Sequence, residues 1–362
     1  MSRTCYIVPS TLPSSFGWQP RASGIRAEQL AAQARLVFDE VRTVLILERY
    51  DLLRSDRGFA TLAAPRADTI IIPEADFKRF CDRVAPATFV FMHSDFADRA
   101  AEAAGKHTIV YDIGSLQELR LERAGASEGQ LSLFRTQHEK IIELSRRAIV
   151  DNPKAARWLK SDLKGQDKSV APLAPDVASS PTQETRTHLL FGGRVARWID
   201  MAPTYRTMAA YLADKPSVPA IMVAPDPKDG DPNVMERSAL SLMTHVTTLW
   251  NLSVHNQAEI FAMSFGAVDW APLDEERVHS LSLPTLQAVA AGVPVLNQPG
   301  TPLDDLWDPF PGERLQEPLN VNAVSTFVER ARSGVYDDAV KKAQATIARW
   351  RTEPGPFEGL AA

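Results

Sequence analysis

Two turns in the second half of the chain carry the residue types that bind phosphate. In the first, the apolar run Leu189–Phe191 leads into Gly192, Gly193 and Arg194, with Arg197 one helical turn further on. Glycines at a strand-to-helix turn let main-chain N–H groups approach an anion, and a helix N-terminus attracts negative charge. The guanidinium of arginine adds permanently charged donors that match phosphate oxygens. We therefore predict that these four residues bind a diphosphate.

The second turn lies in residues 283–300, which read LPTLQAVAAGVPVLNQPG. Leu283, Pro284 and Thr285 open a helix of small residues, and we expect its first amides and the Thr285 hydroxyl to meet the same diphosphate. The alternative is an ordinary helix start. Two phosphate-binding turns within one α/β domain are typical of a nucleotide site.

Two apolar runs in the first half end in residues suited to proton transfer. Asp112 follows TIVY, and His93 follows FVFM. A carboxylate or imidazole at the carboxyl end of a strand can orient a substrate hydroxyl or accept its proton. We predict that Asp112 and His93 are catalytic, one reacting and the other binding. A capping or purely structural role is the alternative for each of them, and Asp95 is better explained as a helix N-cap.

The composition of the 362-residue chain excludes several classes of protein. Lys and Arg number 40 against 45 Asp and Glu, a net charge of −5, which argues against a nucleic-acid binder with a basic surface. The seven His and two Cys (Cys5 and Cys81) form no zinc-type spacing, so we predict no metal. No apolar run reaches the ~18 residues that span a bilayer, and no signal peptide opens the chain. The expected localisation is cytoplasmic.

Short β-branched runs alternate with amphipathic segments along the whole chain, the pattern of parallel sheets covered by helices. Strands are predicted at residues 4–9, 41–48, 69–72, 88–93, 107–113, 148–151, 169–173, 188–191, 220–224, 246–249, 267–271 and 293–296. Helices are predicted at residues 25–37, 76–83, 95–104, 130–147, 201–213, 258–263, 283–291, 323–332 and 337–350.

This alternation predicts an α/β fold of two Rossmann-like domains facing a cleft, with ligands at the carboxyl ends of the strands. The first domain is expected at residues 1–165 and the second at residues 187–335. Residues 166–186, which include APLAPDVASSPTQ, form a Pro- and Ser-rich linker between them. Residues 336–362 are expected to form a C-terminal helix that returns to the first domain.

The order of these motifs resembles the GT-B glycosyltransferases, in particular the large retaining group that uses nucleotide sugars (group 1, family 4-like). In the first half, SSFGWQPRASGIRAEQLAAQA looks like the acceptor-side loop and first helix of that group, with Gly24 at the family glycine. YDIGS looks like its strand facing the cleft, and VAPLAPD like its linker. In the second half, FGGRVARWID, FGAVDWAPLD and LPTLQAVAAGVPVL resemble its donor-side elements.

Two elements depart from the family pattern. A Lys-Gly pair normally follows the Gly-Arg turn, whereas Arg197 and Trp198 are nearest here. Two glutamates eight positions apart are replaced by His279 and Gln287. Gln287 could still bind the donor ribose, but a neutral hydrogen bond contributes about 0.5–1.5 kcal/mol against about 1.5–3 for one to a charged group.

The resemblance implies a metal-independent glycosyltransferase that moves a sugar from a nucleotide-diphosphate donor, its co-substrate, to a hydroxyl of a glycan or glycolipid. It implies retention of configuration, a role in polysaccharide biosynthesis and no cofactor. Ser253, Val254 and His255 fall where the fold reads the base, although His255 could be a helix residue without a ligand. Gly24 and Arg26 fall on the acceptor side, although most arginines of a first helix face water.

Several alternatives remain open from the sequence. The loss of both glutamates favours a catalytically silent GT-B-like binding or scaffold subunit, and a sugar-nucleotide epimerase would share the architecture. The Trp and Arg residues of NPKAARWLK and IARWRTEP indicate amphipathic helices. These helices could contact a membrane peripherally, which would place the protein at the inner face of the membrane. Ordinary helix packing is the other explanation for these segments.

Overall fold

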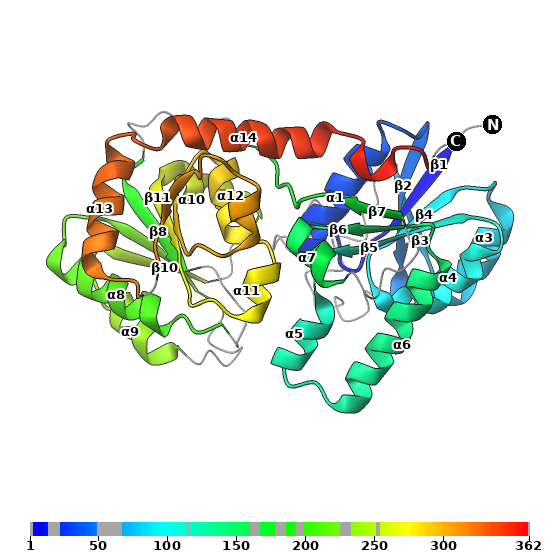
Figure 1. Ribbon diagram of the computed structural model, residues 1–362, viewed down its shortest axis with the longest axis horizontal. Coiled ribbons are helices and arrows are strands. Elements are labelled where there is room, and N and C mark those ends of the chain that lie inside the picture. Colours follow the sequence, from blue (N-terminus) through cyan, green and yellow to red (C-terminus); the bar gives the residue numbers. More distant parts are fainter. Residues whose placement is uncertain are drawn as a thin grey trace. The chain divides into compact units, whose positions relative to one another are not determined.

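The computed structural model describes residues 3–13, 22–48, 67–114, 116–159, 167–177, 186–192, 199–224, 233–250, 254–316 and 318–360. The chain divides into two compact units, coloured along the sequence in Figure 1. Unit 1 comprises residues 1–174 and 349–362, and unit 2 comprises residues 175–348. The chain therefore leaves unit 1 inside the predicted linker and re-enters it within the last long helix.

The described part of unit 1 is built on a seven-stranded parallel sheet with the strand order β3-β2-β1-β4-β5-β6-β7. The strands are β1 (Thr4–Val8), β2 (Glu40–Ile46), β3 (Thr69–Ile72), β4 (Thr88–Phe91), β5 (Thr108–Gly114), β6 (Arg147–Val150) and β7 (Asp167–Val170). The helices are α1 (Ala22–Ala34), α3 (Phe77–Arg83), α4 (Ala97–Ala104), α5 (Gln117–Arg123), α6 (Glu128–Leu144) and α7 (Pro153–Trp158), with the 3-10 turns η2 (Glu74–Asp76), η3 (Ser94–Phe96) and η7 (Gly355–Phe357).

The described part of unit 2 repeats the plan with six parallel strands in the order β10-β9-β8-β11-β12-β13. The strands are β8 (His188–Gly192), β9 (Ala220–Ala224), β10 (Val246–Trp250), β11 (Ser264–Asp269), β12 (Val295–Asn297) and β13 (Gly312–Arg314). The helices are α8 (Ala202–Asp214), α9 (Val234–Ser241), α10 (Val254–Met263), α11 (Glu275–His279), α12 (Leu283–Ala290), α13 (Val321–Arg332) and α14 (Asp337–Thr352), with the 3-10 turn η6 (Pro302–Asp305).

The central strands of both sheets are apolar and buried, as expected where helices cover both faces of a sheet. All four residues of β4 are buried, and Phe89 and Phe91 pack with Phe77 of α3 in the core of unit 1. In unit 2 every residue of β11 is buried, and Phe327 of α13 packs in the core beneath it. Continuous apolar runs of this kind are typical of strands with helices on both sides.

The predicted α/β class and the two Rossmann-like sheets are confirmed, because each sheet contains the 3-2-1-4-5 strand order. The sequence did not predict α5, α9, α11 or β13, whereas α7 lies within NPKAARWLK, a segment interpreted as an amphipathic helix. Helices α5 and α11 have seven and five residues, and so few residues give little helical periodicity. Strand β13 has three residues and begins at Gly312.

The seventh strand lies earlier in the chain than predicted. We expected residues 169–173, whereas β7 covers Asp167–Val170. Its pairing ends when Ala171 donates its N–H to the Val150 carbonyl at 2.8 Å. Pro172 then offers no N–H to extend the ladder. Side chains of α1, described below, take over the carbonyls of this segment.

Candidate functional site

The predicted catalytic residue Asp112 is held in a buried ion pair in unit 1. Its side chain lies on β5 and is 1% exposed. Arg26 of α1 donates from Nη2 to Asp112 Oδ1 at 2.8 Å and from Nε to both carboxylate oxygens at 3.2 and 3.3 Å. Both oxygens of Asp112 are therefore already hydrogen-bonded to a cation.

Arg26 was predicted to contact an anionic acceptor, and in the structure its side chain turns inward instead. The guanidinium is 3% exposed, and its Nη1 donates to the Ala171 carbonyl and, at 3.4 Å, to Gln29 Oε1. Asp112 explains this direction, because a buried carboxylate needs a paired cation. Gly24 is also buried, in the first turn of the same helix.

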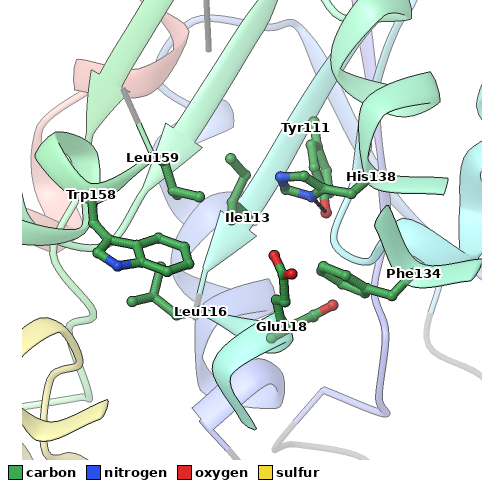
Figure 2. Close-up of a pocket in the computed structure, with 9 residues that line it drawn as sticks. Tyr111, Ile113, Leu116, Glu118, Phe134, His138, Trp158 and Leu159 are labelled. Carbon is green, nitrogen blue, oxygen red and sulfur yellow. Dashed lines mark hydrogen bonds between the residues drawn. The ribbon is translucent and has the colours of Figure 1, made fainter. Parts of the chain in front are cut away.

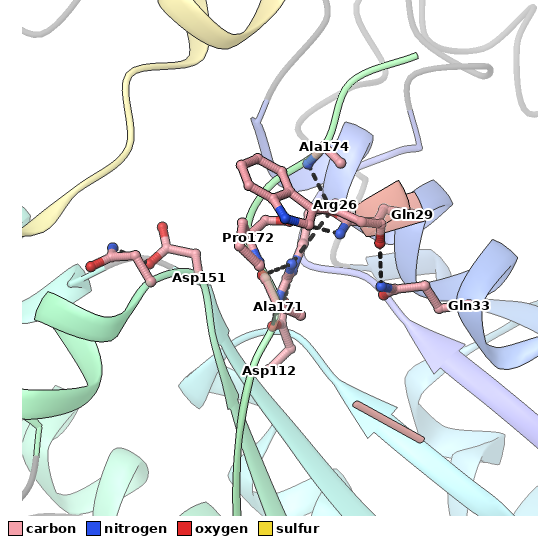
Figure 3. Close-up of polar contacts among 10 residues, drawn as sticks. Arg26, Gln29, Gln33, Asp112, Asp151, Ala171, Pro172 and Ala174 are labelled. Carbon is pink, nitrogen blue, oxygen red and sulfur yellow. Dashed lines mark hydrogen bonds and ion pairs between the residues drawn. The ribbon is translucent and has the colours of Figure 1, made fainter. Parts of the chain in front are cut away.

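Side chains on one face of α1 are hydrogen-bonded to the two segments of unit 1 that lie next to the unit boundaries, residues 171–174 and Trp350. Gln29 donates to the Pro172 carbonyl at 2.8 Å and accepts the Ala174 N–H at 3.0 Å. Gln33, one turn further along the helix, donates to the Trp350 carbonyl at 2.6 Å. Figure 3 shows Arg26, Gln29 and Gln33 arranged along the helix beside this segment. Their spacing of three and four residues places them on one helical face.

A second carboxylate, Asp151, lies at the end of the strand next to Asp112 (Figure 3). Asp112 pairs in register with Ile149, and Asp151 follows Val150, the last residue of β6. Asn152 donates its side-chain N–H to Asp151 Oδ1 at 2.7 Å and caps α7 through the Ala155 N–H. Burial raises the pKa of the Asp151 carboxyl to about 7, with Asp112 adding to the rise and Arg26 and Arg120 opposing it.

His93, the other predicted catalytic residue, follows β4 and caps the 3-10 turn η3. Its Nδ1 accepts the Asp95 N–H at 3.1 Å and lies 3.1 Å from Asp95 Oδ1. The sheet order reverses between β1 and β4, and ligands of open α/β sheets bind outside the carboxyl ends of strands at such a point. The position of His93 is therefore suited to contact a substrate.

A small pocket lies beside β5 in unit 1, with an empty volume of about 270 Å³ that includes its open mouth. Figure 2 shows Tyr111, Phe134, His138 and Trp158 around it, with Glu118 at one side. The Tyr111 hydroxyl and His138 Nδ1 are hydrogen-bonded at 3.1 Å, and Phe134 stacks on the imidazole. The sequence did not predict a pocket formed by these residues, because three helices and a strand contribute them.

Gly192 of unit 2 ends β8 with a left-handed backbone (φ +86°). A Cβ at this position would stand 2.3 Å from the Val223 carbonyl oxygen, so glycine is required. The sheet order reverses between β8 and β11, and Gly192 lies beside this point. The backbone thus turns sharply where the sequence predicted a phosphate-binding loop.

Thr285 faces the interior of unit 2 rather than a ligand site. Its hydroxyl donates to Asp269 at the end of β11 and accepts from Asn297 Nδ2 at 2.8 Å. The Ser282 hydroxyl also donates to Asp269 and caps the Thr285 N–H at 3.5 Å. The Thr285 hydroxyl already donates one hydrogen bond and accepts another inside unit 2, so a phosphate would have to displace Asp269 to receive its proton.

The remaining residues of this predicted donor segment lie on α12. Of the first three residues of α12, Pro284 has no N–H and the Thr285 N–H is bound by the Ser282 cap. Only the Leu283 N–H of these three could therefore donate to an anion. Gln287 is buried in the second turn of the helix. Arg277 of α11 is buried nearby and donates to Asn297 Oδ1 at 3.3 Å and to Gln298 Oε1 at 3.1 Å.

Several predicted donor residues lie outside the described parts of the chain. These are Gly193, Arg194, Arg197 and Ser253. Val254 and His255 begin α10, and the description there covers the backbone alone. The expected contacts of all six residues stay predictions.

Among the described residues, no three His, Cys, Asp or Glu side chains gather as a metal site would require. A search of the same residues finds no helix whose length and hydropathy would let it cross a bilayer.

The comparisons with known proteins rest on structure, because no protein-family model and no curated protein matches the sequence. Sucrose-phosphate synthase from Thermosynechococcus elongatus superposes with a TM-score of 0.65 at 14% identity, over 99% of this chain and 96% of that chain. HepE from Anabaena, solved with UDP-glucose, gives 0.62 at 11% identity, over 98% and 96%. The pneumococcal O-GlcNAc transferase GtfA, solved with UDP and GlcNAc, gives 0.62 at 8% identity, over 97% and 96%.

The chain has the GT-B fold. The match covers both units, so the GT-B architecture that the sequence motifs suggested is confirmed. The sequence also carries a signal for Asp151 and Asp269. Each aspartate directly follows an apolar run of its strand, as Asp112 does. What the pattern could not show is which of the three carboxylates is internally paired.

Proposed function

We propose that this protein transfers a sugar from a nucleotide-diphosphate donor to a hydroxyl of a glycan or glycolipid acceptor. Structures with the same fold carry UDP-glucose, or UDP with a sugar, which supports a uridine nucleotide as the first donor to test. The observation that carries the proposal is Gly192. Its left-handed turn ends the first strand of unit 2, at the strand-order reversal where Rossmann-like sheets bind nucleotides.

In this proposal Gly192 and Gly193 let the main chain approach the diphosphate, while Arg194 and Arg197 neutralise it. Negative charge grows on the diphosphate as the sugar leaves, so fixed cations stabilise the transition state more than the ground state. Such cations can act without a metal ion. We further propose that the anomeric configuration is retained, on the strength of the motif resemblance, and that the acceptor belongs to polysaccharide biosynthesis in the cytoplasm.

The test is a screen of UDP-, GDP-, ADP- and dTDP-sugars for hydrolysis and transfer, with and without a chelator. Arg194→Ala is expected to reduce kcat by about 10²–10³-fold, the usual effect of removing one donor that stabilises a developing anion. Arg206→Ala is the matched control, because its exposed guanidinium lies on α8 of the same unit, 3.8 Å from Glu236. Equal losses in both variants, or no turnover of any donor, would refute the proposal.

Two observations favour a second candidate, a GT-B subunit that binds a nucleotide sugar without turning it over. The predicted catalytic carboxylate Asp112 is neutralised by Arg26, and Gln287 replaces a charged family residue. Donor binding by calorimetry, with Arg194→Ala weakening it and no turnover of any donor, would support this candidate. Proton NMR of a product formed from the α-linked donor tests retention in the active case.

A further inference from the structure

The pocket beside β5 lies within unit 1, because every residue that lines it belongs to that unit. Tyr111 and Ile113 of β5 line the pocket and pack in the same apolar core, and Asp112 lies between them in the strand. Successive side chains of a strand point to opposite faces of the sheet. The pocket is therefore on the face opposite to the Arg26–Asp112 pair and separate from it.

The walls of this pocket are largely apolar and aromatic. Figure 2 shows the Trp158 indole on one side and the Phe134 ring on the other, with the Glu118 carboxylate directed into the space between them. The empty volume is about 270 Å³ with the open mouth included, and a closed apolar cavity of about 150 Å³ already binds benzene. The pocket thus has room for a ligand with a single ring. The apolar and aromatic lining residues are Tyr111, Ile113, Leu116, Phe134, Trp158 and Leu159.

Two neighbouring residues of α5 bring hydrogen-bond acceptors to the lining of this pocket. The side-chain oxygen Oε1 of Gln117 is buried, and it has no hydrogen-bond partner among the residues that the structure describes. The Glu118 carboxylate is 23% exposed and accepts from Arg135 Nε at 2.5 Å. A buried oxygen without a donor costs free energy, and a ligand N–H would supply the missing hydrogen bond. The ligand is therefore expected to be a donor.

The charges around Glu118 favour a donor that is positively charged. Arg135 of α6 pairs with Glu118, but it also lies 3.7 Å from a carboxylate oxygen of Glu122 and 3.1 Å from one of Glu128. One guanidinium thus faces three carboxylates, so negative charge is in excess around it. The two other arginines of α5 do not line the pocket, Arg120 and Arg123.

We propose that the pocket beside β5 binds an organic ammonium compound with an apolar ring. The ring packs among the aromatic and aliphatic walls, and the ammonium group donates to Gln117 Oε1 and faces the Glu118 carboxylate. Aromatic faces also attract a cation, and that of tryptophan, here Trp158, attracts it most strongly. Such binding needs no nucleotide and no residue of unit 2, so this site is independent of the proposed glycosyl transfer.

Three probes of nearly the same shape test the chemistry of the ligand. Benzylamine, benzyl alcohol and ethylbenzene carry an ammonium, a hydroxyl or a methyl group on the same benzyl unit. Each is titrated at neutral pH into the full-length protein, and carbon-edited NMR follows the Ile113 methyl groups, assigned from Ile113→Val. Fragments this small bind weakly, so the titrations extend into the millimolar range. Benzylamine is expected to shift the Ile113 signals saturably and to bind about tenfold more tightly than ethylbenzene.

Substitutions on α5 test the two contacts separately. Gln117→Leu should weaken benzylamine and benzyl alcohol about three- to tenfold, the effect of one neutral hydrogen bond, and leave ethylbenzene nearly unchanged. Glu118→Gln should weaken benzylamine about tenfold and benzyl alcohol by less than about twofold. Glu122→Gln is the matched control, because it removes a carboxylate from the same Arg135 but does not line the pocket. Its affinity for benzylamine should stay within about twofold of wild type, as for an exposed charge.

The comparison of the three probes needs the wild-type protein alone, so it decides the proposal even if a variant fails to fold. Ile113 signals that none of the probes shifts would show that the pocket is not a binding site. Equal affinity for benzylamine and ethylbenzene, or tighter binding of benzyl alcohol, would reject an ammonium ligand. Equal losses in Glu118→Gln and Glu122→Gln would reject the contact with Glu118. Turnover of nucleotide sugars is measured separately, so failure of either proposal leaves the other standing.

Discussion

The Arg26–Asp112 pair predicts a large loss of stability when Arg26 is replaced by methionine. Methionine fills much of the arginine stem but leaves the carboxylate of Asp112 buried without a cation. Removing one partner of a buried pair costs about 3–5 kcal/mol. The same substitution also removes the hydrogen bond from Arg26 Nη1 to the Ala171 carbonyl, in the segment where the chain leaves unit 1.

The chain offers a control of similar geometry in a different environment. Arg35, just beyond α1, donates to Asp68 at 2.8 Å, the distance of the Arg26 Nη2 contact, but both partners are about half exposed. Exposed pairs contribute about 0.2–1 kcal/mol because water screens them. Arg35→Met should therefore have several times less effect than Arg26→Met, although both variants lose one arginine–aspartate pair.

Differential scanning calorimetry measures the difference. Domains of this size lose about 2–4 °C of Tm per kcal/mol, so Arg26→Met should lower the transition of unit 1 by roughly 6–20 °C and Arg35→Met by at most about 4 °C. Hydrogen exchange in peptides of β5 and β6 assigns the transition. The double variant Arg26→Met/Asp112→Leu should regain most of the loss, since an apolar replacement removes both charges. Equal shifts for the two single variants would refute the reasoning.

Three further predictions concern single positions. Gly192→Ala should destabilise unit 2 by well over the ~1–2 kcal/mol that a left-handed alanine costs, because the new Cβ would collide with the Val223 carbonyl. Gly105→Ala is the control in thermal melts and should be tolerated, because no atom lies within 4 Å of its added Cβ. Thr285→Val should cost about 1–3 kcal/mol in urea unfolding by leaving the buried Asn297 amide without its acceptor; an unchanged midpoint would contradict the network. Burial lowers the pKa of His107, whose Nδ1 accepts the Ala87 N–H, so stability should fall as the pH drops below about 6.5, and His107→Gln should flatten that dependence.

The sequence predicted most of the fold because strands in this chain are short apolar runs closed by polar residues. The run FVFM was enough to predict β4, and LPTLQAV to predict α12. What failed was of two kinds. Elements such as α5, with seven residues, are too short to show a period. The end of β7 is set by Arg26 and Gln29, more than 140 residues away in the chain.

The same distinction explains the site. An aspartate at a strand end is visible in the sequence, but its partner is not. Arg26 lies 86 residues before Asp112, and nothing in its local pattern distinguishes it from an exposed helical arginine. The sequence predicts Thr285 as a phosphate ligand because it opens a helix. Its hydrogen bonds to Asp269 and Asn297 depend on β11 and β12 lying side by side. Pairings of this kind follow from the tertiary structure alone.

Both units place a carboxylate in the last residues of a sheet strand and bind it with groups from the first turns of a nearby helix. In unit 1 these are Asp112 and Arg26 of α1, and in unit 2 they are Asp269 and the hydroxyls that open α12. A carboxylate bound in this way holds the strand and the helix together. Its oxygens already accept hydrogen bonds within the protein, so it is poorly suited to accept a proton from a substrate. Chemistry must then come from neighbouring positions that the internal contacts leave available. The left-handed turn at Gly192 is such a position in unit 2.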